Sequence, residues 1–195
     1  MSYIKRIDGR KFDEPRKMEA KIGVIPRADG SAMFKIGDTI AIAAVYGPRE
    51  LHPKFLQNPE KGILRCNYDM ASFSVPERKK PGPTRRSTEI SMVTEKALLP
   101  VLDLNQFPNA VVDVFIEIIQ ANAGTRCAGI TAASMALAHA GVPMKNLISA
   151  VSVGKVGDKI VIDLDKSEED YEDGATDIPV AMTGNHEITL LQLDG

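Results

Sequence analysis

Two adjacent segments of the chain constrain its fold more than any others. Residues 110–121 alternate in the way that is typical of a β-strand with one face in the core. The apolar positions on that face are Val112, Val114, Ile116 and Ile118. Residues 127–140 are rich in alanine, glycine, serine and threonine, which suits a helix packed closely on several sides and ended by Gly141 and Pro143. We expect this helix in the middle of the fold.

Strand patterns dominate both ends of the chain. They cover residues 20–25, 32–36, 39–46, 63–73, 148–153, 160–165, 180–182 and 188–193. A second helix is expected over residues 87–99, ending near Pro100, while residues 51–62 are irregular. The order is therefore a meander of strands, a helix, a strand, a helix and a second meander, which predicts an α+β domain.

The size and charge of the chain set broad limits. Its 195 residues, 44% of them hydrophobic, can bury one sizeable core. We therefore expect a single domain over residues 1–195, with the option that two fused halves build it. A formal net charge of -2 does not indicate nucleic-acid binding by the molecule as a whole. Any affinity for phosphates must come from local patches.

Several kinds of site are not supported by the sequence. Cys66 and Cys127 belong to no C-x-x-C pair, so we expect two buried free thiols in a reducing cytoplasm. His52, His139 and His186 show neither metal-ligand spacing nor a Ser-His-Asp arrangement. No apolar run approaches the ~20 residues that span a bilayer. A soluble, cytoplasmic protein without a membrane segment is the expectation.

The segment between the strand and the small-residue helix is a candidate anion site. Gly124, Thr125 and Arg126 offer backbone N–H groups, a hydroxyl and a guanidinium at one helix N-terminus. A phosphate or sulfate would fit this combination. The alternative is an ordinary turn in which Thr125 caps the helix and Arg126 faces water. The spacing alone leaves both interpretations open.

A basic segment precedes the first helix. Arg78 and Lys79 lie in a proline-containing loop, and Arg85 and Arg86 fall in the first helical turn, where the helix dipole disfavours cations. An external anion would remove that conflict. These cations could neutralise nucleic-acid phosphates, with Tyr68 as a stacking surface for a base. The alternative is a solvated charged loop and a core tyrosine.

Carboxylates are concentrated between residues 167 and 177. Asp177 ends this acidic segment just before a strand pattern, where a fixed carboxylate can bind Mg²⁺ or deliver a proton. For Asp170, Glu172 and Asp173 a hydrated loop is the competing interpretation.

Several short motifs in one order resemble the RNase PH family, and within it the catalytic RNase PH-like subunit of the archaeal exosome. The matching pieces are Arg6–Arg10 with Arg16, Gly37–Thr39, Ala44–Glu50, Arg78–Lys79, Arg85–Arg86, Ala123–Arg126 and Asp177–Pro179. The likeness covers nearly the whole chain. It implies an RNase PH fold of two βαβα-like halves, with mixed sheets packed around central helices.

The resemblance also implies an activity, namely 3′-to-5′ phosphorolysis of RNA that releases nucleoside diphosphates and can run in reverse to add tails. Inorganic phosphate would be the co-substrate, with Mg²⁺ as a cofactor. By this analogy Gly124, Thr125 and Arg126 hold the attacking phosphate. Arg126 is also catalytic, as is Asp177, which acts as an acid or through a metal. The residues expected to contact RNA are Arg85, Arg86, Arg65, Tyr68, Arg78 and Lys79.

The implied assembly is a six-membered ring, a trimer of heterodimers with an inactive homologous subunit, topped by RNA-binding cap subunits. A non-catalytic subunit of an RNA channel and a stand-alone enzyme that trims transfer RNA 3′ ends are the alternatives.

The sequence departs from the family pattern in two places. The acidic loop is one residue longer than usual, with Thr176 where alanine is common, so either Asp170 or Asp173 could join Asp177 as a second, metal-binding carboxylate. The chain also ends at Gly195, where relatives continue into a C-terminal helical segment, so that segment is expected to be missing here.

Overall fold

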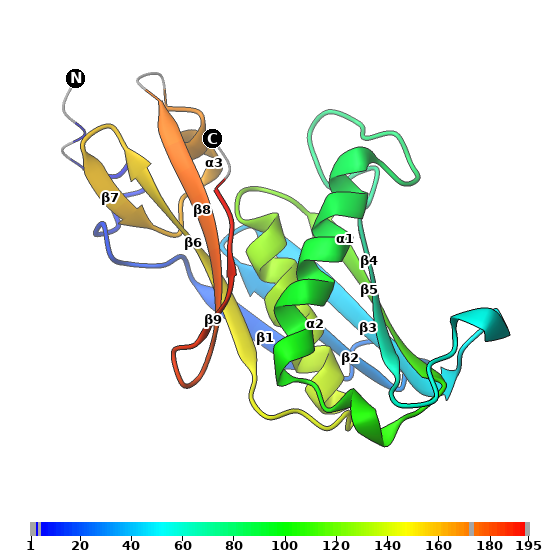
Figure 1. Ribbon diagram of the computed structural model, residues 1–195. Helices are drawn as coiled ribbons and strands as arrows, with labels where there is room; N and C mark the ends of the chain where they lie inside the picture. Colours follow the sequence, from blue (N-terminus) through cyan, green and yellow to red (C-terminus); the bar gives the residue numbers. More distant parts are fainter. Residues whose placement is uncertain (1–2, 4, 172–173, 194–195) are drawn as a thin grey trace.

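The computed structural model of the chain describes residues 3, 5–171 and 174–193. Two β-sheets lie beside two long helices (Figure 1). The strands are β1 (Met18–Ile22), β2 (Gly30–Ile36), β3 (Thr39–Glu50), β4 (Ile63–Met70), β5 (Ala110–Gln120), β6 (Ile148–Val156), β7 (Lys159–Ile162), β8 (Ala175–Thr183) and β9 (Ile188–Leu191). The helices are α1 (Arg85–Leu98), α2 (Thr125–His139) and α3 (Lys166–Glu169), with 3₁₀ turns η1 (Lys54–Leu56), η2 (Leu99–Val101) and η3 (Leu104–Gln106).

The first sheet has the strand order β1-β2-β3-β5-β4. Its strands pair antiparallel except β4 and β5, which are parallel. A parallel pair needs a crossover connection, and α1 supplies it. Helices α1 and α2 both pack on one face of this sheet (Figure 1). The chain therefore enters both helices at the same end of the sheet, where β4 and β5 end.

Helix α2 lies between the two sheets, as its composition predicts. The second sheet, β7-β6-β8-β9, is antiparallel throughout, and its strands β6 and β8 contact α2. Small residues allow α2 to approach the first sheet closely: a Cβ on Gly30 of β2 would lie 2.4 Å from the carbonyl oxygen of Ala136 in α2. One core cluster accordingly joins residues of both sheets to α2, among them Ile116, Ile130 and Ile148.

The sequence-based elements are confirmed apart from their limits and one short helix. Strand β4 ends at Met70 rather than 73, and α1 begins at Arg85 rather than Ser87. Residues 166–169, expected to be loop, form α3, which Asp165 and Glu168 cap reciprocally. Both cysteines are buried free thiols. Within the described ranges, no helix is long and apolar enough to cross a membrane.

An N-terminal arm, residues 3 and 5–17, runs beside the second sheet (Figure 1). Arg6 and Glu168 form a fully buried ion pair at 2.7 Å. Arg16 donates to the buried carboxylate of Asp163 at 2.6 Å. The arginines of the arm therefore fix the strand connection and the short helix that follow β7.

Candidate active site

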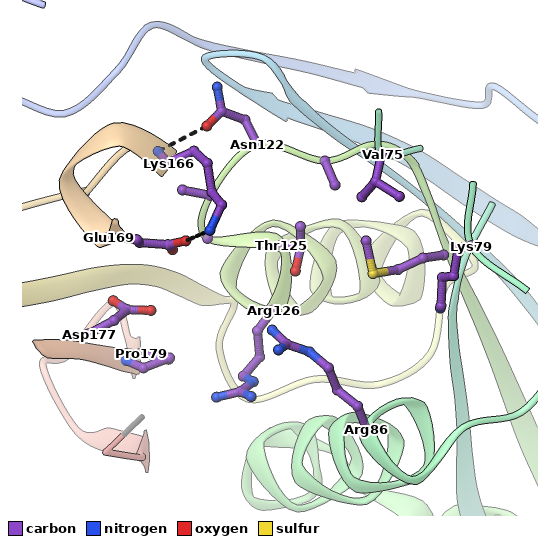
Figure 2. Close-up of a pocket in the computed structure, with 14 residues that line it drawn as sticks. Val75, Lys79, Arg86, Asn122, Thr125, Arg126, Lys166, Glu169, Asp177 and Pro179 are labelled. Atoms are coloured by element: carbon purple, nitrogen blue, oxygen red, sulfur yellow. Dashed lines mark hydrogen bonds and ion pairs between the residues drawn. The ribbon is translucent and has the colours of Figure 1, made fainter. Parts of the chain in front are cut away.

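A pocket of about 330 Å³ opens at the N-terminus of α2 (Figure 2). It gathers side chains from four stretches of the sequence: the end of β4 through the start of α1, the β5–α2 turn with the start of α2, the short helix α3, and β8. The lining residues are Met70, Val75, Lys79, Arg86, Ala121, Asn122, Ala123, Gly124, Thr125, Arg126, Lys166, Glu169, Asp177 and Pro179. Both the candidate anion site and Asp177 belong to this one pocket.

The turn before α2 is held in place from several sides. Gly124 has φ +66°, a left-handed conformation that favours glycine. The hydroxyl of Thr39 donates to the carbonyl oxygen of Ala123 at 2.7 Å and accepts from the backbone N–H of Asn122 at 3.1 Å. Arg16 also donates to the Ala123 carbonyl, at 3.3 Å. The backbone that faces the pocket is therefore preorganised.

The N-terminus of α2 has the features of an anion site. Among the described residues no side chain caps this helix end, so the interpretation of Thr125 as a helix cap is wrong. The first backbone N–H groups and the positive end of the helix dipole thus face the pocket. Arg126 is 5% exposed and lines the pocket, so it does not face bulk water either.

A second arginine reaches the pocket from α1. Figure 2 shows the side chains of Arg86 and Arg126 extending toward the same region from two helices. Lys79 adds a third cation and forms an ion pair with Asp69 at 3.0 Å. Like charges gathered in a partly enclosed space repel each other, and a bound anion would relieve that repulsion. The pocket therefore favours a negatively charged ligand.

Two carboxylates form the opposite side of the pocket. Asp177 lies on β8 opposite Gly154 of β6, and β9 pairs with β8 only farther along, from Val180 to Met182. Glu169 comes from α3 (Figure 2). Burial, followed by the charge of Asp177, raises the pKa of Glu169 to about 7. One of these carboxyl groups can therefore carry a proton near neutral pH.

The second carboxylate of the pocket differs from the expected one. Asp170 is 63% exposed, forms an ion pair with Lys166 at 2.8 Å and does not line the pocket. Asp173 lies outside the described residues. The acidic composition predicts a loop here and gives no sign of Glu169, although the capping pair Asp165 and Glu168 indicates a helical turn. That turn points Lys166 and Glu169 into the pocket.

The remaining predicted RNA contacts are distributed outside the pocket. Arg85 and Arg78 are exposed, and Arg78 lines a separate shallow hollow. Arg65 is half-buried and donates, together with Arg49, to the buried carboxylate of Asp113. Burial raises the pKa of Asp113, but the hydrogen bonds from the two arginines outweigh it and lower that pKa.

The expectation that Tyr68 offers a base-stacking surface is wrong. Tyr68 is 4% exposed, and its ring lies against Gly129, where a Cβ would come within 3.4 Å of the ring. Helix α1 packs on the strand β4 that carries it, and the ring faces Gly129 of α2, so this ring contributes to the core. The alternative interpretation, a core tyrosine, is the correct one.

The residues of the pocket could hold a small divalent cation with the help of a ligand. Asp177 and Glu169 supply carboxylate oxygens, the atoms that Mg²⁺ prefers. Within the part of the chain that the structure describes, no three His, Cys, Asp or Glu side chains form a metal cluster. Mg²⁺ is commonly held by one or two carboxylates plus substrate phosphates, and the pocket offers carboxylates in that number.

The raised pKa of Glu169 predicts a pH-dependent gain in stability for Glu169→Gln. At pH 8 the folded protein holds an ionised Glu169 where its charge is disfavoured, and the variant removes this cost. We expect the variant to be more stable than the original by about 1–3 kcal/mol at pH 8. Since the folded pKa is about 7 and the ordinary value 4.5, the gain should shrink as the pH falls through this window. Urea denaturation at pH 5 and pH 8 measures it, and an equal difference at the two pH values would contradict the assignment.

Comparison with known families defines the class of this protein. Residues 14–143 match the model of domain 1 of the 3′ exoribonuclease family, and residues 146–195 match that of domain 2. The chain therefore belongs to the 3′ exoribonuclease family, which confirms the resemblance to RNase PH.

Its relatives are components of the exosome. The chain is 58% identical over 192 residues to exosome complex component Rrp41 of Thermococcus kodakarensis, covering 98% of this chain and 76% of the relative. The same component of Pyrococcus furiosus is 57% identical with the same coverage. A solved structure of the Archaeoglobus fulgidus exosome with RNA bound to the active site superposes with a TM-score of 0.85 at 26% identity, covering 98% of this chain and 82% of that one. Rice Rrp46 gives the same TM-score at 25% identity, over 97% of this chain and 85% of that one. The RNase PH fold is confirmed, but the expectation of two βαβα-like halves with mixed sheets is wrong in its detail: only the first sheet is mixed, and the described part of the second half has an antiparallel sheet and the short helix α3.

Proposed function

We propose that this chain is a catalytic subunit of an archaeal exosome and degrades RNA from its 3′ end by phosphorolysis. One observation carries the proposal: an anion cradle, made by Gly124, Thr125 and Arg126, shares a pocket with Arg86 and with the carboxylates of Asp177 and Glu169. Hydrolysis by water needs no second anion site, whereas phosphorolysis must bring inorganic phosphate to an RNA phosphodiester.

The pocket supports the following reaction. Inorganic phosphate binds at the N-terminus of α2 and to Arg126, while Arg86 neutralises the terminal phosphodiester of the RNA. An oxygen of the phosphate attacks the phosphorus, and the bond from phosphorus to the 3′ oxygen of the preceding nucleotide breaks. The terminal nucleotide leaves as a nucleoside diphosphate. The released 3′ oxygen takes up a proton, for which Asp177 is the proposed source. The reverse sequence extends RNA from nucleoside diphosphates.

The cations and the oriented backbone groups would supply most of the rate enhancement. Two anions repel each other in solution, and the cradle removes this cost before the reaction begins. Loose phosphoryl-transfer transition states leave little covalent chemistry for the protein, so positioning and charge stabilisation dominate. The left-handed Gly124 and its anchored carbonyl neighbours support this role because they hold the amides in one orientation.

Mg²⁺ would complete the site. As the alternative to its role as an acid, an ionised Asp177 would hold the ion, with Glu169 or, after a local rearrangement, Asp170 as the second carboxylate. The ion would supply neutralisation of the charge that develops on the phosphoryl oxygens. The partners belong to the same proposal: RNA, an inactive homologous subunit that alternates with this chain in a six-membered ring, and RNA-binding caps, in the cytoplasm.

The test uses the chain assembled with its homologous partner subunit. Incubation with 3′-tailed RNA, Mg²⁺ and inorganic phosphate should yield nucleoside diphosphates, and removal of phosphate should stop the reaction. Nucleoside monophosphates as the only products, or no products, would reject phosphorolysis. An Asp177→Ala variant with unchanged activity of the complex would instead favour a non-catalytic ring subunit. Full activity of the chain alone, as a homohexamer by light scattering, would favour the stand-alone enzyme.

A further inference from the structure

A phenylalanine next to the pocket is exposed to solvent. Phe73, in the β4–α1 connection, is 75% exposed. Single exposed apolar residues are common and need no explanation by themselves. What distinguishes Phe73 is the way its loop is fixed and what lies around the ring.

Backbone hydrogen bonds hold the loop that carries Phe73. The N–H of Ala121 donates to the carbonyl oxygen of Ser74 at 2.8 Å, and the N–H of Ala71 donates to Ile118 at 3.0 Å. The loop also closes on itself, since the N–H of Lys79 donates to Ser72 at 3.1 Å. Ala121 lies three residues before Gly124. The position of Phe73 is therefore tied directly to the turn that forms the anion cradle.

A shallow hollow that Phe73 helps to line adjoins the pocket. It has a volume of about 420 Å³ and is lined by Ser72, Phe73, Val75, Pro76 and Arg78. Val75 lines both the hollow and the main pocket, and Figure 2 shows it on the side away from Asp177. A chain that leaves the pocket past Val75 would thus meet the Phe73 ring and the guanidinium of Arg78.

An aromatic face beside cations matches single-stranded nucleic acid. Stacking on aromatic rings binds bases with little sequence preference, and arginines and lysines neutralise the neighbouring phosphates. Arg78 in the hollow and Lys79 in the adjoining pocket supply those charges. An apolar protein partner would carry no negative charge to match the cations beside the Phe73 ring.

We propose that Phe73 and Arg78 form a base-binding subsite for the RNA, upstream of the terminal phosphodiester held in the pocket. This inference rests on the proposed function, since it places the reacting 3′ end in the cradle. The ring stacks on an unpaired base, and Arg78 contacts the adjoining phosphate. The subsite raises the affinity for single-stranded RNA without touching inorganic phosphate.

The chain offers a matched control for a Phe73→Ala substitution. Phe55 is 83% exposed and lies in η1, on the connection between β3 and β4. Figure 1 shows this connection at the opposite end of the first sheet from the β4–α1 connection. Phe55→Ala therefore removes an equally exposed ring that lines neither the pocket nor the hollow. Phe73→Trp keeps a stacking face at the original position.

The experiment compares these variants in the assembled complex. Phe73→Ala should raise KM for single-stranded RNA about tenfold or more and leave KM for phosphate unchanged. Phe55→Ala and Phe73→Trp should both keep a KM for RNA near that of the original protein. For the original protein, RNA with abasic sites in the upstream nucleotides should bind as weakly as intact RNA binds to Phe73→Ala. For Phe73→Ala, the abasic sites should cause little further loss of affinity. Equal RNA binding by Phe73→Ala and Phe55→Ala would overturn the proposal.

Two further outcomes separate the possible failures. If Phe73→Ala dissociated the six-membered assembly on size exclusion while Phe55→Ala did not, the Phe73 side chain would be a contact between subunits. The base-binding subsite would then be rejected. If the original complex showed no phosphate-dependent turnover, the proposed function would fail. Fluorescence anisotropy with labelled RNA would still test Phe73 by itself, because it needs no reaction.

Discussion

Replacing Arg126 with methionine should lower kcat/KM for phosphate-dependent RNA shortening by roughly a thousandfold. Arg126 lines the pocket from the first turn of α2, where its charge adds to that of the helix dipole. Methionine fills a similar volume but carries no charge, so the change removes mainly electrostatic stabilisation. Because the attacking phosphate is the proposed ligand, KM for phosphate should rise along with the fall in kcat. Initial rates over a series of phosphate concentrations measure both.

Controls separate this effect from a loss of folding. Arg27 is exposed on the connection between β1 and β2 and does not line the pocket, so Arg27→Met should leave the rates unchanged. Arg126→Lys keeps the charge but not the fork of donors, and should recover only part of the activity. If Arg126→Met, folded by circular dichroism, retained turnover and its dependence on phosphate, the proposed phosphate site would be wrong.

The sequence predicted the cradle because its determinants are local. A strand, a glycine and a small-residue helix follow one another directly between Ala110 and His139, and each constrains the conformation of the next. The position of Asp177 beside the cradle is not local. It depends on β8 pairing with β6, whose contact with α2 is a tertiary feature. The strand pattern after Asp177 predicted a fixed carboxylate, but only the family motifs combined it with the cradle in one site.

The errors in the prediction also have physical causes. The base-stacking role expected for Tyr68 fails because α1 packs on its strand and the ring lies against Gly129; strands with a parallel neighbour are often covered in this way. Helix α3 spans four residues and would not be stable alone, since short helices depend on tertiary contacts. Periodicity cannot detect a single turn. Glu169 was therefore missed, and Asp170 was expected in its place.

The N-terminal arm explains how so short a helix can hold two residues of the pocket. Glu168 is fully buried within α3 and accepts hydrogen bonds from the hydroxyl of Tyr3 at 2.7 Å and from Arg6 Nε at 2.8 Å and Nη2 at 2.7 Å. Arg6 also donates to the carbonyl oxygens of Ile162 and Asp163. Lys166 and Glu169, on the same turn, line the pocket. The buried ion pair thus connects the arm to the active site.

Glu168→Ala should consequently destabilise the protein by about 3–5 kcal/mol, because Arg6 would remain buried without a counter-charge. For a chain of this size that corresponds to a fall in Tm of roughly 6–20 °C, measured by calorimetry. Activity should fall as well, since α3 loses the contact that positions Lys166 and Glu169.

Glu19, which pairs with Lys17 on the surface at 3.3 Å, is the matched control, and Glu19→Ala should cost less than about 1 kcal/mol. A double variant, Arg6→Met with Glu168→Leu, removes both buried charges and should recover much of the stability. If Glu168→Ala cost no more than Glu19→Ala, the arm would not hold α3 in place, and the position of Glu169 would need another explanation.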